Sequence, residues 1–418
     1  MNNNLTKSDE LVLSNRDKDI LRSIAAEVAE LASRPCEEDK AKLWTKHNKL
    51  ERTRPPVFCD PEHGWTEIIT QDILQCENVR ARNWEYFLRK EVFWGKEMQD
   101  DRVIDPYFRI WYEHTDSGWG LQEIRKSVGE GGSFVWEAPI DDYSKLDKLH
   151  FPQVSVDFEK TNRILDLLNS IFGDLLPTRV NMGWWWSLGM TQTLAYLRGL
   201  EQMMFDMQDE PENLHKLMSI LRDGTIARIE YLEENGLLFL NNDSTYVGSG
   251  GLGWTDELPQ KDYTGKARLK DMWGFCESQE TLGVSPGMFE EFIFQYQLPI
   301  MEKFALNCYG CCEPLEKRWD VVKKAPNLRR VSCSPFSNWS DMAEKLENKY
   351  IFSMKPTPAD LADTVFNEER VRERMRTGLK EAKNCIVELI MKDTHTIRND
   401  PQRVVKWVKI AKEEAENF

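Results

Sequence analysis

From about residue 101 to the C-terminus, short apolar strand-like segments alternate with segments of helical periodicity. Such alternation is typical of a parallel sheet, because parallel neighbours need a long crossover connection, usually a helix. The expected strands are 179–183, 237–243, a cysteine-rich segment from 306, 328–333, 350–353 and 385–390, with helices from Thr191, over 211–235 and over 287–304. No Gly-x-Gly-x-x-Gly turn follows the first strand and no P-loop occurs, so a nucleotide fold has no support. We therefore expect an α/β fold, a closed (β/α)8 TIM barrel.

The first part of the chain has a different pattern. Residues 1–100 are largely helical, with apolar residues at helical spacing, and we expect an N-terminal helical extension preceding a barrel domain over 101–418. Within the extension, Val57-Phe58-Cys59 is expected to be a short strand. Residues 119–136 alternate and contain glycines at 129, 131 and 132, which predicts a β-hairpin insertion.

Polar and thiol side chains follow the expected strands at the points where these strands end. In a barrel, the carboxyl ends of the strands carry the active site. The residues concerned are Asn241, Asn242, Asp243, Cys311, Cys312, Glu313, Ser334, Lys355, Asp393 and His395. Their concentration at strand ends predicts a barrel enzyme.

The segment Leu306–Pro314 reads Leu-Asn-Cys-Tyr-Gly-Cys-Cys-Glu-Pro and holds three of the nine cysteines. Soft thiolates beside a carboxylate suit a transition metal, zinc first. The alternative is that these cysteines are small buried hydrophobic residues. Because adjacent residues of an extended segment face opposite sides, we expect only one of Cys311 and Cys312 to face the site, and the sequence does not decide which.

Composition excludes several classes of function. The chain has 55 basic and 70 acidic residues, a net charge of −15, which argues against nucleic acid as the main partner. No signal peptide and no apolar run of membrane-spanning length is seen, so we expect a cytoplasmic protein without a membrane partner. In that compartment an odd number of cysteines indicates free thiols or ligands rather than disulfides.

Aromatic residues suggest a pocket for a flat ligand. The chain has 15 tryptophans, three of them consecutive just past an expected strand (Trp184, Trp185 and Trp186), and at least one of these should line the mouth of the barrel. Asn241 and Asn242 could supply polar contacts to such a ligand. Tyr246 precedes the glycine-rich segment 248–254 and Trp254 ends it. We interpret this segment as a mobile lid, with which Tyr246 and Trp254 could close over an aromatic ring. Lys355 could pair with a carboxylate of the substrate.

Four segments resemble the uroporphyrinogen decarboxylase superfamily. They are Leu188–Glu201, which contains Thr-Gln-Thr-Leu-Ala-Tyr-Leu-Arg-Gly-Leu-Glu; Glu277-Ser-Gln with Val284-Ser-Pro; Met354-Lys-Pro-Thr-Pro; and Asp393-Thr-His-Thr-Ile. The Arg-rich N-terminal segment that binds porphyrin carboxylates in the decarboxylase itself is absent. The chain is therefore most similar to the corrinoid-dependent methyltransferase branch, which carries zinc.

The resemblance implies an O-demethylase methyltransferase. It would move a methyl group from a small aromatic methyl ether to the cobalamin-type corrinoid of a partner protein, with zinc as Lewis acid. The implied ligands are Cys311 or Cys312, Glu313 or Glu277, and His395; Glu277, Asp243 and Lys355 are the implied catalytic residues. The His-x-Cys ligand pair of the thiol-methylating branch is missing, and His395 stands where that branch has a cysteine.

Three other functions stay open at the sequence level. They are methyl transfer from a methylated corrinoid to a thiol, a decarboxylase of the uroporphyrinogen type, and a corrinoid-protein binder without catalysis. Barrels of this kind often pair, so a homodimer is possible.

Overall fold

The computed structural model describes residues 11–127 and 134–418. The helices are α1 (Asn15–Ala32), α2 (Pro35–Asn48), α3 (Trp65–Ile68), α4 (Val79–Phe93), α5 (Phe158–Phe172), α6 (Thr191–Arg198), α7 (Leu200–Asp209), α8 (Pro211–Glu234), α9 (Pro286–Phe289), α10 (Gln295–Met301), α11 (Trp319–Val322), α12 (Trp339–Leu346), α13 (Ala359–Ala362), α14 (Glu368–Glu381) and α15 (Gln402–Glu416). The strands are β1 (Val57–Cys59), β2 (Phe108–Ile110), β3 (His114–Asp116), β4 (Ile124–Ser127), β5 (Phe134–Glu137), β6 (Val154–Val156), β7 (Thr178–Val180), β8 (Tyr246–Val247), β9 (Gly251–Leu252), β10 (Trp273–Cys276), β11 (Leu306–Tyr309), β12 (Leu328–Cys333), β13 (Ile351–Met354) and β14 (Ile386–Met391).

A six-stranded parallel sheet is the centre of the fold, with the strand order β1-β14-β13-β12-β11-β10. Each ladder in it is parallel, so the carboxyl ends of all six strands meet at one edge. Every residue of β10, β11, β13 and β14 is buried, as expected for parallel strands covered on both faces. The prediction of an α/β fold with a parallel sheet is confirmed.

The remaining parallel strands form a separate pair, β2 with β7. Within residues 11–127 and 134–418, no hydrogen-bonded ladder joins this pair to the six-stranded sheet, so a closed barrel is not observed. The expected strand 237–243 is not a strand. Instead, the side-chain amide of Asn241 donates to the Trp273 carbonyl and accepts from the Trp273 N–H, both at 3.0 Å. One side chain thus replaces the backbone ladder that would have joined this segment to β10.

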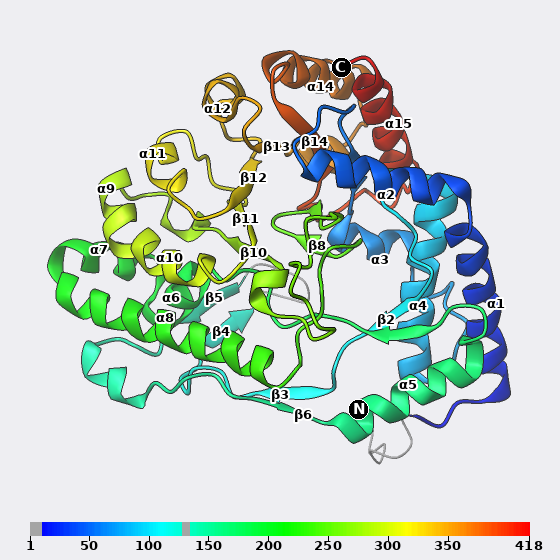
Figure 1. Cartoon of the computed structure of the whole chain (residues 1–418), viewed down its shortest axis with the longest axis horizontal. Helices are drawn as coiled ribbons and strands as arrows, with labels where there is room; N and C mark the ends of the chain where they lie inside the picture. Colours follow the sequence, from blue (N-terminus) through cyan, green and yellow to red (C-terminus); the bar gives the residue numbers. More distant parts are fainter. Residues whose placement is uncertain (1–10, 128–133) are drawn as a thin grey trace.

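Helices surround the sheet, and the N-terminal helices α1, α2 and α4 lie together at one side of the molecule (Figure 1). The predicted helices of the first 100 residues are present, with α1 packed along α4. The predicted strand Val57–Cys59 is confirmed as β1, and it pairs with β14 near the end of the chain. The first 100 residues therefore share the central sheet with the last strand. No helix in the described parts of the chain has both the length and the apolar character needed to cross a bilayer.

The predicted β-hairpin insertion is confirmed by the antiparallel pairing of β4 with β5. Its expected glycine turn, with residues 129, 131 and 132, lies outside the described residues. A second small antiparallel pair, β3 with β6, lies next to it in the chain.

The glycine-rich segment after Tyr246 is buried inside the molecule, so the prediction of a mobile lid is wrong. It forms the hairpin β8–β9, which lies centrally between β2 and the sheet in Figure 1. Its glycines allow close contact with inward side chains: a Cβ on Gly248 would lie 2.6 Å from Cys308 and one on Gly250 would lie 2.5 Å from Ile390. The sequence pattern of a flexible loop here reflects tight packing rather than motion.

Gly253→Ala is expected to destabilise the fold. A Cβ at Gly253 would lie 1.8 Å from the Asn241 carbonyl oxygen, so the hairpin would have to shift away from the strand-like segment that it covers. We expect a loss of roughly 1–3 kcal/mol in the free energy of unfolding, measured by denaturant titration. The matched control is Gly287→Ala, in α9, where no atom lies within 4 Å of the new methyl group. Equal stability of the two variants would contradict the close packing of this hairpin.

Candidate active site

The three residues Cys311, Cys312 and Glu313 follow β11 directly, at the carboxyl edge of the central sheet. Gly310 makes the turn with φ 89°, a left-handed conformation that L side chains rarely adopt. Glu277 follows β10, the neighbour of β11 in the sheet, and Lys392 follows β14, which is separated from β11 by β12 and β13. The parallel sheet therefore gathers thiols, carboxylates and an ammonium group at one edge.

Both thiols face the same point, contrary to the prediction that only one would. The sulfur atoms of Cys311 and Cys312 lie 3.5 Å apart. The Ser249 hydroxyl, from the buried hairpin, donates to the Cys311 sulfur at 3.3 Å, and the Cys312 thiol donates to Asp393 Oδ2 at 3.4 Å. Side chains alternate only along an extended strand, and the turn at Gly310 ends that alternation.

The environment of the pair favours one thiolate. The hydrogen bond from Cys312 lowers the pKa of Cys311 against the effect of burial, and Lys392 adds to this lowering. The same hydrogen bond, together with burial, raises the pKa of Cys312. Burial alone would lower the pKa of Lys392, but the Cys311 thiolate, Asp393 and Glu62 raise it, so the ammonium stays charged. Of the two thiols, Cys311 is thus the one that loses its proton more readily.

The two glutamates at this edge are buried and hydrogen-bonded. Glu313 accepts from the backbone N–H groups of Ser278 and Cys311, both at 2.8 Å. Glu277 accepts from the Ser187 hydroxyl at 3.2 Å and from the Gln279 N–H at 3.0 Å. Burial raises the pKa of Glu277 well above its usual range, and the nearby carboxylates of Glu280 and Glu313 raise it further. Burial also raises the pKa of Glu313, against its hydrogen bonds from the backbone. Glu313 therefore holds the two strand-end loops together, and the surroundings of Glu277 favour its protonated form.

The structure does not bring His395 to the thiols. Its ring is exposed and stacks on His63, with ring centroids 5.3 Å apart. Two thiolates bound to one tetrahedral zinc lie roughly 3.8 Å apart, since each Zn–S bond is about 2.3 Å. The Cys311–Cys312 separation fits two such positions, but among the described residues no group of three or more His, Cys, Asp or Glu side chains is placed to hold a metal ion. The thiol pair therefore fits zinc in part, without a preformed third protein ligand.

Lys355 lies in a buried polar network behind the thiols. Its ammonium donates to the Ser353 hydroxyl at 2.6 Å, and Ser353 in turn donates to Glu388. Glu388 also accepts from Arg330 and bonds His47. Burial lowers the pKa of Lys355 to about 8. This arrangement engages Lys355 within the protein rather than presenting it for a substrate carboxylate.

The three consecutive tryptophans, Trp184, Trp185 and Trp186, differ in their burial and in their contacts. Trp184 is buried and donates to the Leu237 carbonyl, and Trp185 is half-buried. Trp186 is 47% exposed and lies 5.9 Å from the Lys392 ammonium, measured to its ring centroid. Of the three, Trp186 is the one placed beside the thiol site.

The other expected substrate contacts lie away from the thiols. Asn242 donates to the Leu258 carbonyl, and Trp254 donates to the Ser244 hydroxyl. Asp243 accepts from Tyr107 at 2.6 Å, and the Tyr246 hydroxyl donates to Asp60 at 2.7 Å. Tyr246 lines a separate cavity, and Asp243 contacts two residues of the wall of that cavity, Tyr107 and Arg109.

Sequence reasoning missed two groups of the thiol site. Lys392 directly follows the apolar run of β14, so the rule that strand ends carry function could have found it. Ser249 had no comparable signal, because the segment that carries it looked like a loop and its burial depends on tertiary packing. Ser249 donates a hydrogen bond to Cys311, and the charge of Lys392 lowers the pKa of Cys311.

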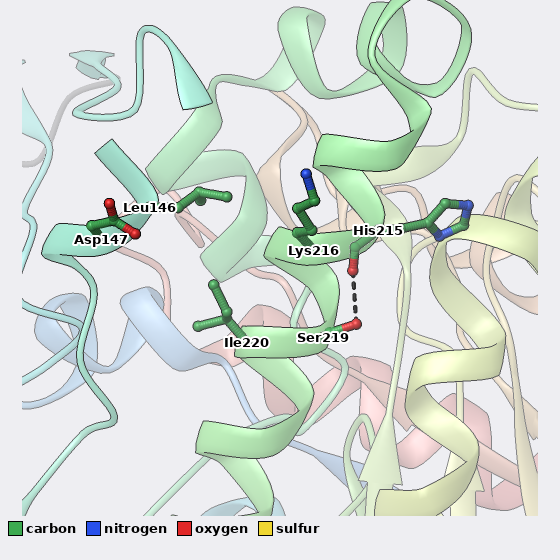
Figure 2. A pocket seen from close by; sticks show the side chains of 6 residues that line it. All are labelled: Leu146, Asp147, His215, Lys216, Ser219 and Ile220. Carbon is green, nitrogen blue, oxygen red and sulfur yellow. Dashed lines mark hydrogen bonds between the residues drawn. The ribbon is translucent and has the colours of Figure 1, made fainter. Parts of the chain in front are cut away.

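Another hollow, of about 480 Å³, lies between the 3₁₀ helix Tyr143–Lys148 and α8 (Figure 2). The Ser219 hydroxyl there donates to the His215 carbonyl of its own helix at 2.8 Å. The His215 ring bonds the Tyr296 hydroxyl at 2.8 Å. Both polar groups are thus engaged in supporting α8.

No family model and no curated protein matches this chain.

Proposed function

We propose that this protein is a methyltransferase that moves the methyl group of an aryl methyl ether to the cobalt of a corrinoid carried by a partner protein. The observation that supports this most is the thiol pair Cys311–Cys312, with its sulfur atoms 3.5 Å apart and a lowered pKa on Cys311, at the carboxyl edge of a parallel sheet. Sites at this edge are typical of barrel enzymes. The pair β2–β7 beside the six-stranded sheet supplies the further parallel strands that a (β/α)8 barrel would require.

Zinc is the cofactor that this proposal implies, with Cys311 and Cys312 as the residues that would hold it. When bound, zinc would polarise the ether oxygen and make the phenolate a better leaving group. Lys392 would balance the thiolate charge, and Ser249 would orient the Cys311 sulfur. Trp186, exposed beside Lys392, would line the mouth of the thiol site.

Glu277 would supply the proton that the reaction needs. The methyl group leaves the ether oxygen as its C–O bond breaks, and the electron pair of that bond stays on the phenolate. The cobalt of the partner, in its reduced nucleophilic state, provides the electron pair of the new bond to the methyl carbon. The Glu277 carboxyl, protonated because it is buried among other carboxylates, then protonates the phenolate oxygen.

Glu277→Gln is expected to lower turnover by about 100-fold, because the amide cannot protonate the leaving group. The assay is methylcobalamin formation from reduced cobalamin and methoxybenzene derivatives, followed by absorbance. Glu290→Gln, which removes a surface carboxylate that pairs with Lys324, is the control and should retain most of the activity. Undiminished turnover of Glu277→Gln would contradict its role as proton donor.

The same assay separates the competing functions. Methylation of a small thiol by free methylcobalamin, without ether cleavage, would favour the thiol methyltransferase instead. Binding of a corrinoid protein without turnover would indicate a non-catalytic binder. Release of CO2 from a porphyrinogen would indicate a decarboxylase.

A further inference from the structure

A cavity of about 300 Å³ lies between α4, the strands β2 and β7, and the buried hairpin β8–β9. Residues directly after β1, β2 and β7, namely Asp60, Trp111 and Asn181, line it. The volume is at the small end of the range for small-molecule sites, which suits a single substituted ring. Trp94 and Phe87, together with Trp111, give it aromatic walls.

Three cationic side chains line this cavity, and two of them are matched by carboxylates. Arg102 forms a bidentate pair with Glu91, at 2.6 and 2.7 Å. Arg109 donates to Asp105 at 2.6 Å and lies 3.3 Å from Asp243. The charges of these two guanidinium groups are therefore balanced by carboxylates of the protein itself.

The third cation, Lys90, has no such partner. Within residues 11–127 and 134–418, its ammonium takes part in no hydrogen bond and no ion pair, and it instead faces aromatic rings. The distance from the ammonium to the ring centroid is 4.8 Å for Trp65 and 5.2 Å for Trp94. Burial lowers the pKa of Lys90, although Asp60 opposes this lowering. Rings attract a cation, but they do not replace the hydrogen bonds that a buried ammonium loses.

Asp60, the carboxylate whose charge acts most strongly on Lys90, is not free to serve as its partner, because both of its oxygens already accept hydrogen bonds. One oxygen of Asp60 accepts from the Trp65 indole at 2.7 Å and from the Glu62 N–H at 3.0 Å. The other accepts from the Tyr246 hydroxyl at 2.7 Å. A carboxylate brought by a ligand would give Lys90 the hydrogen-bonded partner that it lacks.

We propose that this cavity binds the substrate as an aromatic monocarboxylate, with Lys90 as its counter-ion and the aromatic wall around its ring. The remaining carboxylates of the wall disfavour a second negative charge on the ligand, so a dianion would bind less well. This inference deepens the proposed function, on which it rests for the reaction but not for the binding.

Two connections join the cavity to the thiol site. The hairpin that contributes Tyr246 to the cavity also carries Ser249, whose hydroxyl donates to Cys311. The loop after β1 contributes Asp60 to the cavity, and its Glu62 accepts from the backbone N–H of Asp393, which contacts Cys312. A ring anchored at Lys90 would thus lie against the same two segments that contact the thiols.

The test compares 4-methoxybenzoate with its neutral isostere 4-methoxybenzamide by calorimetric titration of the full chain. We expect the unmutated protein to bind the benzoate about 10- to 100-fold more tightly than the amide, because only the carboxylate makes a charged hydrogen bond with Lys90. Lys90→Met should lose this preference and bind both ligands alike. Lys96→Met is the control, since Lys96 is half-exposed and pairs with Glu27 at the surface.

Either of two results would overturn the inference: no preference for the benzoate in the unmutated protein, or a preference that survives in Lys90→Met. The first comparison needs no variant, so misfolding of Lys90→Met would leave the inference testable. Tight benzoate binding that depends on Lys90, without any methyl transfer, would uphold the inference and contradict only the proposed function.

Discussion

Replacing both Cys311 and Cys312 with serine is expected to reduce methyl transfer by about 10³-fold or more, since loss of Lewis-acid activation costs several kcal/mol of the barrier. Serine is close to cysteine in size, so the turn at Gly310 and the contacts of Glu313 should persist. The hydroxyl groups would neither ionise at neutral pH nor act as soft ligands. The measurement is the rate of methylcobalamin formation at saturating ether, with the melting temperature as a check on folding.

Cys36→Ser is the matched control, because Cys36 is exposed on α2 and remote in the sequence from the strand ends. It should leave the rate unchanged. A double variant that folds and keeps the rate of the unmutated protein would exclude the thiol pair from the reaction. The single variants Cys311→Ser and Cys312→Ser would then identify whether either thiol has any effect alone.

Arg330→Met is expected to destabilise the protein by about 3–5 kcal/mol, because it leaves a buried carboxylate without its main counter-ion. Arg330 is 2% exposed and donates to Glu388 at 2.9 and 3.1 Å and to Asn48 at 2.6 Å. Glu388 is fully buried in β14, between the strands β1 and β13. Denaturant titration measures the change. Arg16→Met, which removes a mostly exposed pair with Glu77, should leave stability almost unchanged.

The same network predicts a loss of stability in acid. Burial alone would raise the pKa of Glu388, but Arg330 and the hydrogen bond to His47 hold it well below its ordinary value of 4.5. The unfolded chain therefore binds more protons than the folded chain as the pH falls below that value. The stability that Glu388 contributes is present above this pH and lost progressively below it. In Glu388→Gln this part of the pH dependence should disappear; an unchanged acid profile would contradict the assigned ionisation.

Much of the fold could be predicted because its signals are local. The apolar runs of β13 and β14 and the helical periodicity of α8 identify elements that their own residues favour. The segment 237–243 was mistaken for a strand because its composition suits one, whereas a single Asn241 side chain makes the bonds to β10. Closure of the barrel likewise depends on pairings between distant segments, which periodicity does not specify.

The site shows the same division between local and tertiary information. The run after Tyr309 marks the thiols. Glu277 was suggested only by the resemblance, because β10, which it follows, was not among the expected strands. The position of His395 depends on how its loop folds, and here the ring stacks on His63. The glycines of the hairpin β8–β9 were interpreted as flexibility, although they serve close packing against Cys308 and Ile390. Lys90 gave no signal in the sequence, because its four neighbouring rings come partly from another helix.

The metal content of the purified protein tests the central claim most directly. Elemental analysis of chain purified without chelators should find about one zinc per chain, by the rule that a thiolate site binds one ion. The Cys311→Ser, Cys312→Ser double variant should contain none, while Cys36→Ser keeps the full amount. Absence of zinc from the unmutated protein, after incubation with zinc and removal of the excess, would contradict the account and leave the thiol pair as a site of different chemistry.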